Sequence, residues 1–563
     1  MSALNVFGFL LPVKDTTDPL QNPRLAASWL GELPPLDVIA RQQQAMRAFE
    51  GMRQNGKPVD LARIGAISFL DGALGADRRQ LTKQYVENVD ASPMLANRLF
   101  QALQDLTQGF LFAYQVALKQ ALEQSAASRW KSVIPMLLAR LIHYHGTDSK
   151  LRVFRFERWI PAKWTELHRL YQQAVSLGVD RAPTSLINAS ANAAQWTVEQ
   201  EYVFVLLMHQ LNTGNLTPAE LDWASSQLRA WSRRLALDAM ARSADGFCVD
   251  LAGKTCLVRR TGNESGSMLR YLDTTPLSEA LERAIHALLR AEVEGIATPI
   301  NAQRVAILER LRPSLAPNLN ADLRRDPRQA VQVSAKVRVG LSRICRNLAA
   351  EDPNASPPEA DEHIEVFAVN DGSRPRPQVQ DERDSVLRSL SVFSDPMWEV
   401  RDRSVAGLRI AAAGGLGQSL TLGALIAVRQ SDLDDWAIGV VRRLNKISKE
   451  EIEAGLSIIA GQAVPVSLHA RRESSGGMEV NGLEVSTIGA RFGGIYLPPP
   501  SRPDKPITVK TLIVPTSEYV AGRKIVLTTS RSAYTVALRT LIEQRAEWSW
   551  AAIQIIEKKP REF

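Results

Sequence analysis

Residues 324–341 have the sequence Arg-Arg-Asp-Pro-Arg-Gln-Ala-Val-Gln-Val-Ser-Ala-Lys-Val-Arg-Val-Gly-Leu. The valines from position 331 to position 339 alternate with polar side chains, a period of two that is typical of a β-strand with one buried face. Arg324, Arg325 and Arg328 precede this strand, and the first and last of them have the spacing RxxxR. The segment therefore predicts a basic arm that leads directly into the first strand of a β domain.

The chain before this segment has the periodicity of helices. One apolar face, with spacings of three and four, is formed by Leu99, Leu103, Leu106, Phe110, Ala113 and Ala117. Pro161 lies at an expected helix start, and Thr217-Pro-Ala-Glu220 combines a capping-box spacing with a proline at the first helical position. We predict a mostly helical region over residues 1–320, in one or two subdomains, with a β-hairpin near residues 247–258.

The chain after the segment has β character. Short apolar runs bounded by glycine occupy residues 398–410, 425–429, 436–444, 452–459 and 464–468. Short strands at such regular spacing favour a closed antiparallel barrel. An acidic, proline-rich stretch over about residues 351–384 predicts a flexible insertion with at most one short strand, at residues 364–369.

The last part of the chain continues with strand-like runs at residues 507–514, 524–529, 534–541 and 553–556. A proline-rich segment at residues 498–506 is expected to separate them from the barrel. The predicted fold class is a multidomain α and β protein. It consists of the helical region, an antiparallel β-barrel over residues 321–470, and a small β-rich C-terminal unit over residues 480–563.

Composition narrows the function classes. The 68 basic and 60 acidic residues leave a net charge of +8, which favours anionic ligands but does not by itself predict a DNA-binding groove. Cys248, Cys256 and Cys345 form no CxxC pair, so no metal site is expected, and so sparse an odd set favours a reducing compartment. No signal peptide and no apolar run long enough to cross a membrane is found, so we expect a cytoplasmic protein.

A second motif, Asp402-Arg-Ser404-Val-Ala-Gly407, has the pattern DxSxxG and is expected within the strand at residues 398–410. Asp402 and Ser404 are two residues apart, so on a strand they project from the same face. A carboxylate can accept hydrogen bonds from the N1–H and exocyclic amine of guanine, and a glycine allows close approach of the backbone. Arginines supply a fork of donors that fits phosphate or the O6 and N7 atoms of guanine.

The two motifs and two later runs together resemble the PilZ domain family. The later runs are Trp436-Ala-Ile-Gly-Val-Val-Arg-Arg-Leu444 and Glu453-Ala-Gly-Leu-Ser-Ile-Ile-Ala-Gly461. The resemblance covers about residues 322–470 and implies a bacterial β-barrel receptor for cyclic di-GMP. It implies that Arg324, Arg325 and Arg328 grip phosphate and stack on guanine, and that Asp402, Ser404 and Gly407 hold a guanine edge. Arg328 and Asp402 are 74 residues apart, more than is usual in the family, which the acidic insertion accounts for.

The resemblance predicts an effector that catalyses nothing, has no cofactor other than its ligand cyclic di-GMP, and couples ligand binding to the helical region and a partner protein. The alternatives are a nucleotide-independent PilZ-like scaffold for protein assembly and, from the basic charge, a partner of RNA, although nucleic-acid binding is not expected.

Two weaker candidate sites are interpreted as structural. Gly253-Lys-Thr lacks the spacing and the following helix of a phosphate-binding loop, and His143 and His145 are interpreted as histidines near a helix end.

Overall fold

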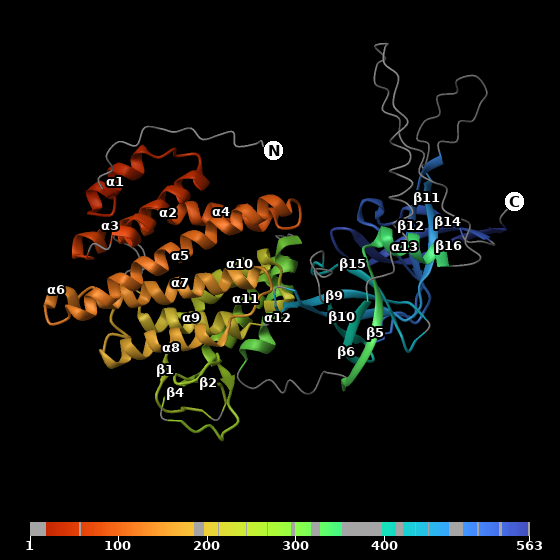
Figure 1. Cartoon of the computed structure of the whole chain (residues 1–563). Coiled ribbons are helices and arrows are strands. Elements are labelled where there is room, and N and C mark those ends of the chain that lie inside the picture. The colour runs from red at the N-terminus through yellow and green to blue at the C-terminus, as the bar shows by residue number, and fades with distance from the viewer. Residues whose placement is uncertain are drawn as a thin grey trace, which may run out of the picture. The chain divides into compact units, whose positions relative to one another are not determined.

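A computed structural model describes residues 18–55, 58–184, 196–211, 213–243, 245–266, 268–293, 299–316, 327–351, 397–412, 420–433, 435–448, 450–471, 488–503, 506–528 and 532–560. The chain forms two units, Met1–Leu323 and Arg324–Phe563. Helices dominate the first unit and strands the second, as Figure 1 shows.

The first unit is built from long helices and one small sheet. Its helices are α1 (Pro23–Glu32), α2 (Val38–Asn55), α3 (Leu61–Ala73), α4 (Gly75–Asn88), α5 (Pro93–Glu123), α6 (Ser128–Lys131), α7 (Ile134–Phe154), α8 (Pro161–Ser176), α9 (Val198–Gln210), α10 (Pro218–Ser232), α11 (Thr275–Val293) and α12 (Pro299–Leu315), with a 3-10 turn η1 (Thr213–Asn215). Its antiparallel sheet has the order β1-β4-β2-β3 and consists of β1 (Leu237–Asp238), β2 (Phe247–Asp250), β3 (Val258–Arg259) and β4 (Leu269–Leu272).

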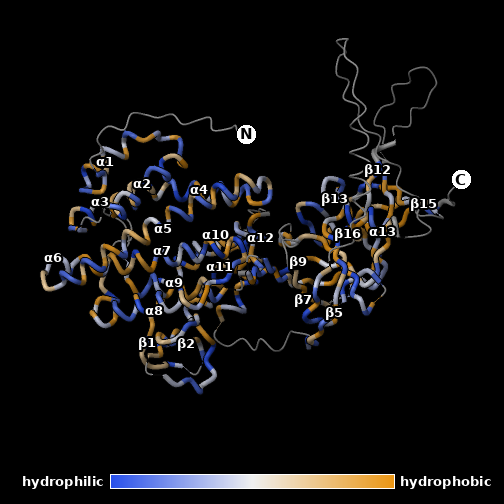
Figure 2. Tube along the Cα trace, in the orientation of Figure 1, coloured by the Kyte–Doolittle hydropathy of each residue, from blue (hydrophilic) through white to orange (hydrophobic). Residues whose placement is uncertain are grey.

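The helix signals of the sequence correspond to helices of the structure. The apolar face predicted between Leu99 and Ala117 is buried along α5. Pro161 is the first residue of α8, and Thr217 forms the predicted capping box with Glu220 at the start of α10. Figure 2 shows hydrophobic and hydrophilic residues interleaved along these helices, as expected for helices that each bury one face.

The predicted hairpin near residues 247–258 is also present. β2 pairs with β3, with Cys248 opposite Val258, and Gly253 lies in the turn between them. Gly253-Lys-Thr is therefore part of a hairpin and does not lead into a helix, which confirms that it is not a phosphate-binding loop of the P-loop type.

The second unit contains two closed barrels. The first has the order β10-β7-β6-β5-β8-β9 and consists of β5 (Gln329–Val339), β6 (Met397–Ser404), β7 (Gly407–Ala412), β8 (Leu425–Gln430), β9 (Ala437–Lys446) and β10 (Ile452–Ala460). All its pairings are antiparallel, so the predicted antiparallel barrel is confirmed. One helix, α13 (Leu341–Glu351), follows β5.

The C-terminal β part is a barrel in its own right. It has the order β11-β12-β13-β16-β15-β14 and consists of β11 (Val464–Arg471), β12 (Ile488–Leu497), β13 (Thr511–Pro515), β14 (Lys524–Thr528), β15 (Ser532–Gln544) and β16 (Trp548–Pro560), with a 3-10 turn η3 (Thr516–Glu518) after β13. In each barrel the first strand pairs with the second and fourth, the third with the second and sixth, and the fifth with the fourth and sixth. The second barrel therefore repeats the topology of the first.

This duplication changes two sequence-based assignments. The run at residues 464–468 is the start of β11 and belongs to the second barrel, and the proline-rich segment at residues 498–506 lies between β12 and β13 inside that barrel. Both assignments rested on spacing along the chain. Spacing cannot show which strands pair, because the turn from β10 to β11 is as short as a hairpin turn within one barrel.

The two barrels pack against each other through one shared hydrophobic cluster, and the second barrel also has a core cluster of its own. Buried residues of α13, of the first barrel and of the second barrel form a single cluster, in which Trp548 and Trp550 are fully buried. The Trp548 indole N–H donates to the carbonyl oxygen of Gly423 at 3.0 Å, and Arg442 of β9 forms a two-point ion pair with Glu543 of β15 at 2.5 and 2.6 Å. The barrels therefore form one packed body.

We predict that Trp548→Ala destabilises both barrels, although the residue lies in the second one. Truncating a fully buried tryptophan removes packing worth about 3–5 kcal/mol. Hydrogen exchange on the full chain should show lost protection in β8 and β9 as well as in β13, β15 and β16. Leu541→Ala, at a more exposed position on β15, is the matched control and should change little. Lost protection confined to the second barrel would contradict a shared core.

Candidate functional site

The DxSxxG motif forms a tight hairpin. Asp402 and Ser404 lie on β6, a turn of two residues follows, and Gly407 begins β7. In this register Ser404 lies opposite Gly407, and Asp402 lies opposite Arg409. The sequence-based prediction of one strand over residues 398–410 was wrong at this point. The two turn residues, Val405 and Ala406, are apolar and include no proline, glycine or asparagine, so the turn carries none of the usual turn signals.

Gly407 lies where the hairpin approaches β10. A Cβ at this position would lie 3.2 Å from the carbonyl oxygen of Leu456 and 3.4 Å from the Ser404 hydroxyl oxygen. It would also lie 3.9 Å from a terminal nitrogen of Arg328. Glycine therefore permits the close approach of three site elements. The turn is held in addition by the Ile458 N–H, which donates to the Ala406 carbonyl oxygen at 2.9 Å.

Asp402 is the centre of the site. Asp402 is only 9% exposed, and each of its carboxylate oxygens contacts a different arginine. Arg328 Nη1 donates to Oδ1 at 2.7 Å, and Arg409 Nε lies 2.7 Å from Oδ2. Both arginine side chains are roughly half exposed, at 50% and 44%. The hairpin therefore presents two accessible guanidinium groups around one nearly buried carboxylate.

The structure brings together four of the six predicted residues, namely Arg328, Asp402, Ser404 and Gly407. Arg324 and Arg325 lie outside the described residues, as do the insertion after Glu351 and the predicted strand at residues 364–369. Arg409 was not predicted from the sequence. The signal that identifies it is the hairpin register, because a two-residue turn between Ser404 and Gly407 places position 409 opposite Asp402.

An ion-pair network extends from this centre along the barrel wall. Arg409 Nη1 lies 3.8 Å from Glu453 Oε1, and Arg401 Nη1 donates to the same oxygen at 2.8 Å. Arg401 also pairs with Glu451 and Glu399. The hydrogen bonds that Arg401 donates to Glu453 and Glu451 raise the pKa of Arg401 above its usual range. The Asp402 site is thus bordered by a chain of alternating charges.

The second barrel lacks both motifs at the corresponding positions. The residues before its first strand are Gly461-Gln-Ala463, without an arginine, and the β12–β13 connection over residues 498–510 contains no DxSxxG. The repeated topology therefore carries the candidate site in one barrel only.

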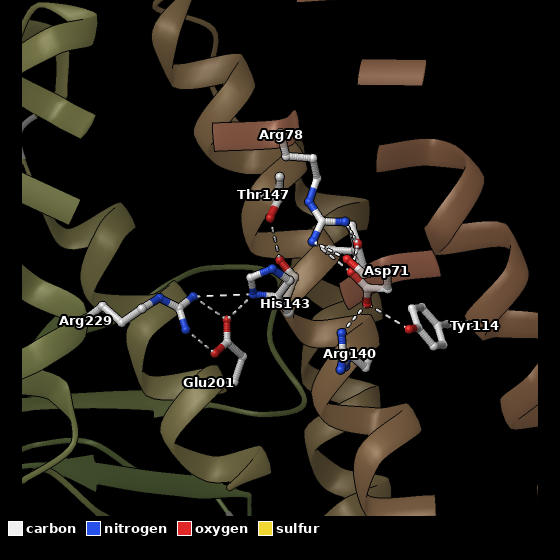
Figure 3. A network of polar contacts seen from close by, with 9 residues as sticks. Asp71, Arg78, Tyr114, Arg140, His143, Thr147, Glu201 and Arg229 are labelled. Carbon is white, nitrogen blue, oxygen red and sulfur yellow. Dashed lines mark hydrogen bonds and ion pairs between the residues drawn. The ribbon is translucent and has the colours of Figure 1, made fainter. Parts of the chain in front are cut away.

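The helical unit contains a buried charged cluster around Asp71 (Figure 3). The Asp71 carboxylate accepts hydrogen bonds from the hydroxyl groups of Tyr114 at 2.8 Å and Tyr144 at 2.6 Å, and it pairs with Arg78 and Arg140. Burial alone would raise the pKa of Asp71, but Arg78 and Arg140 hold it well below its usual range. The cluster joins α3, α4, α5 and α7, and its carboxylate is fully paired.

A neighbouring cluster in the same unit joins α7, α9 and α10. Arg229 donates to both oxygens of Glu201 at 2.7 Å, and the Nδ1 atom of His143 lies 3.0 Å from Glu201 Oε1 (Figure 3). Burial would raise the pKa of Glu201, but Arg229 and His143 lower it to about 2. We interpret both clusters as structural, because the Asp71 and Glu201 carboxylates are buried and paired with arginines and are not accessible to a ligand from solvent.

The histidines of α7 differ from their sequence-based interpretation. His143 and His145 lie in the middle of α7 and not near its end. His143 is bound to Glu201, and burial lowers the pKa of His145 to about 4. The periodicity of the sequence did not show the end of α7, because the apolar pattern is interrupted by buried polar residues that pair with distant helices.

Among the described residues, no three histidine, cysteine, aspartate or glutamate side chains gather in a way that could hold a metal ion. None of the helices described is both long enough and apolar enough to span a bilayer.

The chain matches two family models. Residues 24–242 match the N-terminal domain of the cyclic-di-GMP receptor FimW, and residues 359–465 match the middle PilZ domain of that receptor. Together the matched ranges cover more than half of the chain. The second range includes the β6–β7 hairpin with Asp402, Ser404 and Gly407, whereas β5 and Arg328 precede it. No curated protein matches the chain.

We predict that Glu201 stabilises the helical unit above about pH 4.5 and that this contribution is lost as the pH falls to about 2. A carboxyl whose pKa is lower in the folded state binds its proton preferentially in the unfolded state, so acid favours unfolding. Glu201→Gln should cost about 3–5 kcal/mol at neutral pH, because Arg229 loses its buried partner.

The measurement is chemical unfolding followed by far-UV circular dichroism across this pH range. The difference in unfolding free energy between the natural protein and Glu201→Gln should shrink on acidification. A difference that is constant with pH would show that Glu201 is not ionised in the folded protein.

Proposed function

Since the chain belongs to the family of the cyclic-di-GMP receptor FimW, we propose that it is an effector that binds cyclic di-GMP at the β6–β7 hairpin and catalyses no reaction. The observation that carries the proposal is the convergence of Arg328 and Arg409 on Asp402 beside Ser404 and Gly407. Cyclic di-GMP presents two phosphates and two guanines, so it requires both cationic donors and a carboxylate acceptor.

Each residue has a role that its chemistry supports. The half-exposed guanidinium of Arg328 can hold a phosphate at two points or stack on a guanine. The Asp402 carboxylate can accept from the N1–H and exocyclic amine of guanine, and Ser404 adds a hydroxyl beside it. Arg324 and Arg325 precede Arg328 and supply further positive charge to the same arm. Gly407 allows Ser404 and Arg328 to lie close together beside the hairpin.

The pairing of Arg328 with Asp402 does not prevent binding. The half-exposed guanidinium of Arg328 is already accessible to water, and Asp402 keeps Arg409 as a partner when Arg328 leaves, so breaking this pair costs little. Cyclic di-GMP can replace it with two charge-assisted contacts, of phosphate to Arg328 and of guanine to Asp402. We infer that the ligand exchanges this pair rather than entering an empty site.

Signal output is proposed to pass to the helical unit. The arginine arm lies in the sequence between α12 and β5, so a ligand that contacts Arg324, Arg325 and Arg328 restrains the connection between the two units. The helical unit would then present or withhold a surface for a partner protein. The alternative is a nucleotide-independent scaffold for protein assembly, which would require neither ligand binding at the hairpin nor a change in the helical unit.

We predict that the full chain binds cyclic di-GMP and that Arg328→Ala loses about 2–5 kcal/mol of binding free energy, or more than about 30-fold in Kd. Isothermal titration calorimetry with GTP as a control ligand measures this. Arg403→Ala is the matched control variant. Arg403 lies on β6, the strand that carries Asp402, but its ion-pair partner is Asp432. Its loss should therefore leave Kd unchanged.

Two outcomes would contradict the proposal. A folded natural protein that does not bind cyclic di-GMP would favour the scaffold. Equal losses in Arg328→Ala and Arg403→Ala would mean that the barrel attracts the ligand by general charge and not at this hairpin.

We predict that cyclic di-GMP slows amide exchange in the helical unit, first in α11 and α12, which lie closest in sequence to the arginine arm. Hydrogen-exchange mass spectrometry with and without ligand measures this, and Arg328→Ala at the same ligand concentration serves as control. Protection confined to residues after Arg324 would show binding without coupling.

A further inference from the structure

Arg409 contacts the same carboxylate as Arg328 but from the other side. It lies on β7 directly across from Asp402, and its Nε is 2.7 Å from Oδ2. On its other flank the β10 residue in register is Gly455, which has no side chain to cover it. Arg409 is therefore held at its Nε while the end of its guanidinium remains accessible at 44% side-chain exposure.

We propose that Arg409 is a positioning and specificity residue of this site. It fixes the Asp402 carboxylate so that a guanine edge is accepted and an adenine edge is rejected, and it adds a second positive charge beside the phosphate. This inference rests on the proposed function and adds to it the group that sets base selectivity.

The Asp402 carboxylate has acceptor positions for both an arginine and a guanine. Each carboxylate oxygen can accept two hydrogen bonds; Oδ1 accepts one from Arg328, and Oδ2 forms an ion pair with Arg409. Once Arg328 turns to the phosphate, Oδ1 is free and Oδ2 keeps one position beside Arg409, which leaves enough acceptor positions for the N1–H and exocyclic amine of one guanine. Asp402 can therefore bind guanine without losing its contact with Arg409.

In the proposed complex, Arg328 changes its partner while Arg409 keeps its contact with Asp402. Arg328 belongs to the arm before β5 and turns to the phosphate in the proposed exchange. Arg409 is anchored within the barrel, because β7 pairs with β6 and with β10 on its two sides. It is then the arginine that continues to orient a carboxylate that is only 9% exposed.

Neighbouring charges keep Arg409 in this place. Glu453 Oε1 lies 3.8 Å from Arg409 Nη1 and is itself held by Arg401 at 2.8 Å. Glu453 is 8% exposed, so its carboxylate has little freedom to move. Arg409 is thus placed between two fixed carboxylates, and its direction toward Asp402 is determined by the barrel.

Base selectivity follows from the fixed orientation. Adenine has an acceptor where guanine has the N1–H donor, and it lacks the exocyclic amine next to it. Against an oriented carboxylate this places two acceptors face to face and leaves a nearly buried charge without its donors. A carboxylate that can rotate would discriminate less, because it could turn one oxygen away from the adenine.

The test compares Arg409→Gln with Arg403→Gln on the full chain, using cyclic di-GMP and cyclic di-AMP as ligands. We expect Arg409→Gln to weaken cyclic di-GMP binding by about tenfold or more, to reduce the affinity ratio between the two ligands, and to reduce the salt dependence of binding. Arg403→Gln should match the natural protein in all three measurements.

Arg409→Lys separates charge from positioning. A lysine keeps the positive charge but has a single flexible ammonium group, so part of the affinity should return while the selectivity stays low. If Arg409→Gln does not fold, the selectivity of Arg409→Lys decides the question alone. If these variants keep the ratio of cyclic di-GMP to cyclic di-AMP affinity that the natural protein has, the inference is overturned while the proposed function stands. Absence of binding by the natural protein would overturn both.

Discussion

The site depends on one constraint, which is that the Asp402 carboxylate is nearly buried and must be paired. An unpaired charge at that depth costs several kcal/mol, so the fold has to bring cations to it. It does so from two directions, with Arg328 at the start of β5 and Arg409 across the β6–β7 hairpin. The same two arginines make the site attractive to an anion, because each keeps about half of its side chain exposed.

The rest of the second unit acts as a rigid support for this arrangement. The second barrel repeats the topology of the first but lacks its motifs, and it contributes buried tryptophans and the Arg442–Glu543 pair to a shared core. A barrel supported in this way can hold the hairpin register that sets Asp402 opposite Arg409. The buried ion clusters around Asp71 and Glu201 have a similar supporting role among the helices of the first unit.

The sequence predicted those parts of the molecule that depend on neighbours along the chain. Helix faces such as that of α5, the capping box of Thr217 and most strands of the first barrel follow from local periodicity and turn chemistry. Four residues that the two motifs identified also lie together in the structure.

Features that depend on distant pairing were not predicted. The closure of the second barrel, the partners of Asp71, and the position of His143 within α7 all arise from contacts between residues far apart in the sequence. Arg409 is the instructive case, since it lies only two residues beyond Gly407. It was missed because its role follows from a two-residue turn inside what looked like one continuous strand.

The most direct test of the account is a crystal structure of the full chain with cyclic di-GMP. The account predicts a guanine edge within hydrogen-bonding distance of the Asp402 carboxylate, Arg328 turned from Asp402 to a phosphate, and Arg409 still in contact with Asp402. A ligand bound elsewhere, or a ligand at the hairpin with the pair of Arg328 and Asp402 intact, would contradict it.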